Sequence, residues 1–187
     1  MYGGVMDPLR ELLSTDERQT FEFFFQGLCE VTGRKSDNDR ELMYVTSVLA
    51  HFAITSCQTK KCGETPCVCR RCSHSDGLFS TPENLVSVFD RFVIGNKPTD
   101  DADTIAAGGS KSLLLAGYLR RQMSRRHDVG WYDQVGSMLY TKASQCSSSK
   151  QAGQLYDGLA HSFSFWTRSC SKLQRYFYEE RYLIKMQ

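Results

Sequence analysis

The chain has 187 residues, 41% of them hydrophobic and 24% charged, which is typical of a folded globular protein rather than a disordered one. Its formal net charge is only +2, so overall charge does not by itself indicate a nucleic-acid-binding protein. No segment approaches the roughly 20 apolar residues of a membrane-spanning helix, and no secretory signal is visible at the N-terminus. We therefore expect an intracellular protein, cytoplasmic or nuclear, without a membrane partner.

The first part of the chain is predicted to form two amphipathic helices. In the first, over residues 15–32, Phe21, Phe24 and Leu28 recur at helical spacing. Gly33 is placed to end this helix in the left-handed conformation. The second helix is predicted to begin at Ser36 and to run into the cysteine segment. Its buried stripe is predicted to consist of Leu42, Val45, Leu49, Phe52 and Ala53.

Five of the eight cysteines fall within residues 57–74, which indicates a metal site. Zinc is commonly held by four soft ligands supplied as two close pairs. Cys69 and Cys72 form one pair, Cys57 and Cys62 the natural second pair, and Gly63 lies at a bend between the pairs. The reserve ligands are Cys67 and His74. Because two ions would need about eight ligands, we expect one zinc ion.

Two other interpretations of this segment remain open. The cysteines could be free thiols, although exposed thiols are liable to oxidation and rarely cluster. A redox pair formed by Cys67 and Cys69, or by Cys69 and Cys72, would have flanking arginines that lower a thiol pKa. However, no strand–helix pattern of a thioredoxin-like scaffold precedes these pairs. A closed structural zinc site is the favoured interpretation.

A third helix is predicted from Thr81 to Gly95, and the polar residues 96–103 are predicted to form an exposed connector. The connector would separate an N-terminal half (1–95), containing the zinc knuckle (57–74), from a C-terminal half (104–187), unless both form one continuous domain. The C-terminal half is predicted to contain three or four helices. The first runs through Tyr118 to Arg126 and the second from Trp131 to Lys142. The third carries Leu155, Leu159, Phe163 and Trp166, and the last carries Leu173, Phe177 and Ile184.

Two groups of basic residues are candidates for nucleic-acid binding. The first interleaves with the metal ligands and consists of Lys60, Lys61, Arg70 and Arg71. The second lies on a predicted helix without acidic residues from Ser110 to His127 and consists of Arg120, Arg121, Arg125 and Arg126. Such a helix could neutralise several phosphates. The alternative is a solvated face whose arginines pair with acids elsewhere, such as Asp100, Asp101 or Asp103.

The C-terminal segment mixes basic with aromatic side chains. Arg168, Lys172 and Arg175 alternate there with residues such as Trp166 and Phe177, which we expect to belong to the core. The remaining aromatics could stack on unpaired bases or form an interface buried in a homo-oligomer.

The sequence therefore predicts a mainly α, compact multi-helix domain with a zinc-stapled loop between its second and third helices. The leading functional hypothesis is a non-enzymatic, zinc-binding protein that binds nucleic acid or acts as a regulator, with RNA preferred over DNA. The alternatives are a protein-interaction adaptor, of a style seen in viral accessory proteins, that uses the knuckle and the aromatic C-terminal helix, and, less favoured, a thiol oxidoreductase.

Overall fold

A computed structural model of the chain describes residues 17–34, 39–61, 102–125 and 127–179, and these residues are mainly helical without any strand. The elements are the α-helices α2 (Glu17–Thr32), α3 (Arg40–Lys61), α5 (Ala102–Leu113), α6 (Arg120–Met123), α7 (Val129–Cys146), α8 (Lys150–His161) and α9 (Phe163–Glu179), with the π-helix η3 (Leu114–Tyr118) between α5 and α6. The predicted helical fold class is confirmed. The predicted helix from Thr81 to Gly95 and the zinc-stapled loop lie outside the described residues.

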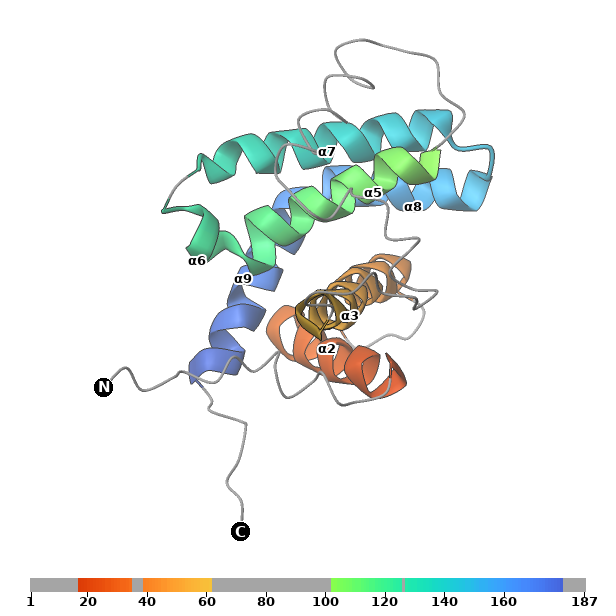
Figure 1. Cartoon of the computed structure of the whole chain (residues 1–187). Helices are drawn as coiled ribbons and strands as arrows, with labels where there is room; N and C mark the ends of the chain where they lie inside the picture. The colour runs from red at the N-terminus through yellow and green to blue at the C-terminus, as the bar shows by residue number, and fades with distance from the viewer. Residues whose placement is uncertain (1–16, 35–38, 62–101, 126, 180–187) are drawn as a thin grey trace, which may run out of the picture.

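The helices form two groups that α9 joins (Figure 1). Helices α2 and α3 pack together as a hairpin, and α5, α7 and α8 pack side by side in the other group. Helix α9 contacts α2 as well as η3, α7 and α8. The largest fully buried side chains come from both groups and from α9, among them Phe24, Tyr140 and Trp166.

Helix α2 ends as its sequence predicts. Gly33 has a φ of +70°, and its N–H donates to the carbonyl oxygen of Cys29 at 2.9 Å. The next helix begins later than predicted, at Arg40 instead of Ser36. The reason is its cap: Asp39 Oδ1 accepts a hydrogen bond from the N–H of Leu42 at 3.1 Å, which satisfies a free donor of the first turn.

The buried stripe predicted for the second helix is confirmed on α3. Leu42, Val45, Leu49 and Ala53 are each at most 1% exposed, and Phe52 packs at the edge of the core. These side chains fix the rotation of α3 about its axis, and with it the direction in which the helix presents its polar residues.

The C-terminal half differs from the prediction at three boundaries. Helix α5 begins at Ala102, which is 8% exposed, so the last two residues of the predicted exposed connector are helical. The break before the last helix is at Ser162, so Trp166, Leu173 and Phe177 lie on one continuous helix, α9. The basic segment predicted as one helix is divided by η3, where the N–H of Leu119 donates to the carbonyl oxygen of Leu114 at 2.8 Å, a π-type bond. The described part of the chain contains no helix with the length and apolarity needed to cross a membrane.

Candidate nucleic-acid interface

The arginine segment after η3 serves two different purposes. Arg120 is half-buried, and its Nη1 atom lies 3.5 Å from Oδ2 of Asp133 on α7 and donates to the carbonyl oxygen of Ala116 at 3.3 Å. This arginine therefore helps to attach the segment to α7. Arg120 thus pairs with an acid elsewhere, as the alternative interpretation expects, but the acid is Asp133; Asp103 accepts a hydrogen bond from the hydroxyl of Tyr156 at 3.2 Å.

The next two arginines of the segment face solvent. Arg121 and Arg125 are exposed, and the four-residue helix α6 buries none of its residues. Arg126 lies outside the described residues. Because α6 ends at Met123, Arg125 lies beyond the helix, and the predicted continuous helical face does not extend over the arginines that the structure describes.

Helix α9 carries a second basic surface, which we call the α9 stripe: Arg168, Lys172, Arg175 and Tyr178. The spacing of four, three and three residues places these side chains on one face of the helix. The three basic residues are exposed, and Tyr178 is 40% exposed. Helix α9 contains no acidic residue before Glu179.

The opposite face of α9 explains why the stripe points outward. Trp166, Cys170 and Leu173 are fully buried, and Phe177 is 7% exposed, which confirms the core positions predicted for Trp166 and Phe177. The α9 stripe was not among the predicted site residues. Its helical spacing is readable in the sequence, but the predicted boundary between Trp166 and Leu173 obscured it.

The net positive charge is concentrated in the C-terminal half of the chain, because acidic residues are scarce there. Residues 104–179 contain ten Lys and Arg but only four Asp and Glu, whereas the whole chain has a net charge of +2. Of these basic residues, Lys111 is 4% exposed, and burial lowers its pKa to about 8. The others include the exposed side chains of α6 and α9. In the part of the chain that the structure describes, neither Lys172 nor Arg175 forms an ion pair.

The cysteine segment begins within α3. Cys57, Lys60 and Lys61 belong to the last two turns of that helix, so the first predicted ligand is attached to a regular element. The remaining candidate residues of the segment, namely Cys62, Cys67, Cys69, Arg70, Arg71, Cys72 and His74, lie outside the described residues. Within the ranges that are described, no three His, Cys, Asp or Glu side chains are grouped to hold a metal ion.

The three cysteines outside this segment form no disulfide. Cys170 is fully buried against η3, and burial raises its pKa to about 12. A thiol of this kind is protonated at neutral pH and is a poor nucleophile. Cys29 and Cys146 are half-buried.

A buried polar cluster joins α3, α5, α7 and α8. The hydroxyl of Ser110 lies 2.9 Å from the hydroxyl of Tyr44 and 3.0 Å from that of Tyr140, and Tyr156 stacks on Tyr140. Burial raises the pKa of all three tyrosines, so they remain protonated at neutral pH. With mutual hydrogen bonds and little exposure, the cluster stabilises helix packing.

No family model, curated protein or solved structure matches this chain.

Proposed function

We propose that this protein is a non-enzymatic nucleic-acid-binding protein that prefers RNA and contains one structural zinc ion. The observation that carries the proposal is the α9 stripe, with three exposed cations and a tyrosine on one face of a helix whose opposite face is fixed in the core. Arg121 and Arg125 add two further exposed cations.

The energetic argument rests on phosphate neutralisation. Each basic side chain that contacts a phosphate releases condensed counterions, so binding weakens as the salt concentration rises. Three contacts on single-stranded RNA give a slope of log K against log salt of about −2, and five contacts give about −3.5. Tyr178 at the end of the stripe supplies a surface on which an unpaired base can stack, a contact worth about 1–3 kcal/mol.

The preference for RNA rests on two features. Zinc knuckles with basic loops favour single-stranded RNA, and the segment with Lys60, Lys61, Arg70 and Arg71 has this composition. A stripe on a helix with one aromatic side chain is also better matched to flexible single strands than to base readout in a duplex groove.

Charge reversal with a matched control tests the interface. Fluorescence anisotropy with a labelled 12-nucleotide single-stranded RNA of mixed sequence is measured for wild type, Lys172→Glu/Arg175→Glu and Arg18→Glu/Lys150→Glu. Both double variants change the net charge equally, but Arg18 and Lys150 are exposed on other helices. We expect the α9 variant to lose at least about tenfold in affinity and the control less than about threefold.

The same assay examines Arg121 and Arg125, the two exposed arginines that follow η3, and the type of nucleic acid. Arg121→Glu/Arg125→Glu should weaken RNA binding relative to the wild type and make the slope of log K against log salt less steep. DNA of identical sequence should bind more weakly than RNA, because it lacks the 2′-hydroxyl. Equal losses in the α9 and control variants would mean that only net charge matters and would refute the proposed interface.

Zinc is tested by comparing the native and denatured masses of the purified protein. We expect the added mass of one zinc ion, retained through four of Cys57, Cys62, Cys67, Cys69, Cys72 and His74 and lost in Cys69→Ser/Cys72→Ser. A native mass equal to that of the bare chain would remove zinc from the proposal and return the thiol alternative to consideration.

A protein-interaction adaptor that uses the knuckle and the aromatic helix is the alternative. Helix α9 directs Phe163, Trp166 and Phe177 into the core, which leaves Tyr178 as its exposed large aromatic side chain in the described range. This distribution favours the nucleic-acid proposal over an aromatic protein interface. The buried, protonated thiol of Cys170 likewise gives no support to a thiol oxidoreductase.

A further inference from the structure

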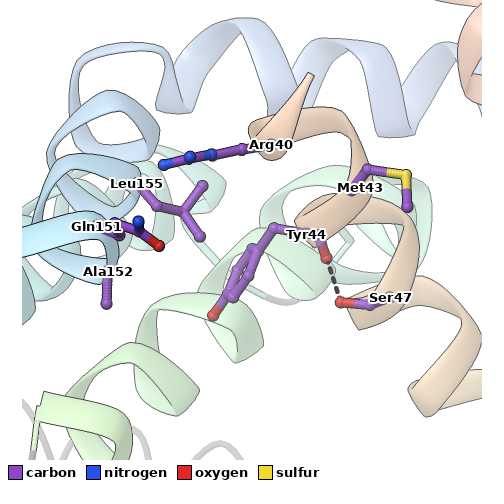
Figure 2. Close-up of a pocket in the computed structure, with 7 residues that line it drawn as sticks. All are labelled: Arg40, Met43, Tyr44, Ser47, Gln151, Ala152 and Leu155. Carbon is purple, nitrogen blue, oxygen red and sulfur yellow. Dashed lines mark hydrogen bonds between the residues drawn. The ribbon is translucent and has the colours of Figure 1, made fainter. Parts of the chain in front are cut away.

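A groove with a volume of about 550 Å³ lies between the first turns of α3 and α8 (Figure 2). Its lining residues are Arg40, Met43, Tyr44 and Ser47 of α3 and Gln151, Ala152 and Leu155 of α8. Its size is within the roughly 300–1,000 Å³ that is usual for binding pockets.

The wall contributed by Tyr44 is held in place before any ligand binds. The hydroxyl of Tyr44 lies 2.9 Å from that of Ser110, and its ring makes edge contacts with Tyr140 and Tyr156. A prearranged wall lowers the entropic cost of binding. Met43, which is 36% exposed, and the half-buried Leu155 add apolar surface beside it.

The electrostatic character of the groove is positive. Figure 2 shows the Arg40 guanidinium extending from α3 toward Leu155 and Gln151 of α8. Among the residues that the structure describes, no acidic side chain lines the groove and none forms an ion pair with Arg40. The first residue of α8 is the exposed Lys150, and the N-terminus of that helix carries partial positive charge.

We propose that this groove binds an acidic peptide segment in which a bulky apolar side chain is adjacent to a carboxylate. The apolar side chain would contact Met43, Tyr44 and Leu155, and the carboxylate would pair with Arg40. Guanidinium–carboxylate pairs have bidentate geometry, which gives such a contact directional specificity. The inference does not depend on nucleic-acid binding, because none of the residues that line the groove belongs to the α9 stripe.

The test measures, by fluorescence polarisation, the binding of a fluorescein-labelled peptide of sequence Gly-Asp-Leu-Phe-Asp-Gly to the full chain. Two matched probes replace either both aspartates by asparagine or Leu-Phe by Ser-Ser. We expect the parent peptide to bind with a dissociation constant below about 1 mM. Each matched probe should have a dissociation constant at least about fivefold higher.

The protein variants are Arg40→Glu and the control Arg18→Glu, which makes the same charge change at an exposed site on α2. Arg40→Glu should weaken peptide binding at least about tenfold and the control less than about twofold. An acidic residue at the first position of α3 is favourable for the helix, so the variant should remain folded. In an NMR titration of the protein with the parent peptide, the changes in amide chemical shift should centre on residues 40–47 and 151–155.

Three results would overturn the proposal. These are absence of binding up to about 1 mM, binding unaffected by Arg40→Glu, and shift changes centred elsewhere. A concentration-dependent dimer that Arg40→Glu abolishes, without peptide binding, would assign the groove to a second copy of the chain instead.

Discussion

Replacing Glu41 should show how strongly the hairpin of α2 and α3 is attached to the rest of the molecule. Glu41 Oε2 accepts hydrogen bonds at 2.8 Å from the indole N–H of Trp166 and at 2.8 Å from the hydroxyl of Ser162. A Cβ atom on Gly158 would lie 2.5 Å from Glu41 Oε1, so a larger residue there would require the carboxylate to shift. The carboxylate thus joins the first turn of α3 to the junction of α8 and α9.

The cost of Glu41→Ala follows from the partners that remain. Trp166 is fully buried, so its N–H would lose its acceptor, which costs about 1–3 kcal/mol. The hydroxyl of Ser162, which has a single proton, can donate instead to the carbonyl oxygen of Gly158 at 2.7 Å. Arg34 Nη1, which lies 3.9 Å from Glu41 Oε2, keeps its hydrogen bond to Asp39 Oδ2 at 2.7 Å. Neither therefore adds much. Glu41→Gln keeps a neutral acceptor and should cost about 1 kcal/mol or less.

Urea unfolding followed by tryptophan fluorescence measures these differences in the free energy of unfolding. In a Trp166→Phe background, which removes the indole donor, Glu41→Ala should cost at least about 1 kcal/mol less than in wild type. The control Glu22→Ala removes an exposed pair with Arg18 and should cost less than about 0.5 kcal/mol. Equal costs of Glu41→Ala in both backgrounds would refute the role assigned to the Trp166 bond.

Two further predictions concern packing and pH. Gly136→Ala should lower the free energy of unfolding by about 1–3 kcal/mol, because its Cβ would lie 2.1 Å from Cζ of the buried Phe163. A Cβ on Gly153 would meet its nearest atom at 3.4 Å, so Gly153→Ala should instead raise the free energy of unfolding by about 0.5–1 kcal/mol. Destabilisation by both substitutions would contradict the packing argument. The pKa of the Cys170 thiol is about 12 in the folded protein, whereas its ordinary value is 9.0. Since only the unfolded chain loses this proton between these two values, the contribution of Cys170 to stability is complete below pH 9.0 and is lost toward pH 12. Cys170→Ala should flatten this part of the curve of unfolding free energy against pH, and an unchanged slope would show that other groups cause the loss.

Periodicity predicted the elements whose burial follows from local pattern. The apolar spacing of α3 and the ending of α2 at Gly33 are both set by residues within a few positions of one another. The beginning of α3 was misplaced because both Ser36 and Asp39 are acceptable caps in sequence. The bond from Leu42 to Asp39 distinguishes them only in three dimensions.

The division of the basic segment could not be predicted from local pattern. The run from Leu113 through Leu115 is compatible with an uninterrupted helix, and no proline marks a break. The π-helix is associated with a tertiary contact: a Cβ on Gly117 would lie 2.9 Å from Cβ of Cys170 on α9. After this register change Arg120 contacts Asp133, a partner that sequence separation does not reveal.

The two proposed surfaces share the support that Glu41 provides, but to different degrees. Arg40 and Tyr44 flank this residue in the first turns of α3, so loss of its bond to Trp166 should let that end of α3 move relative to α8 and change the groove. Lys172 lies on the same helix as Trp166 but more than a turn beyond it, where Leu173 is fully buried and lies against Gly27 of α2. Peptide binding should therefore be sensitive to Glu41→Ala in folded protein, whereas RNA binding should not. If both activities fell together, the groove and the α9 stripe would have to be parts of one surface.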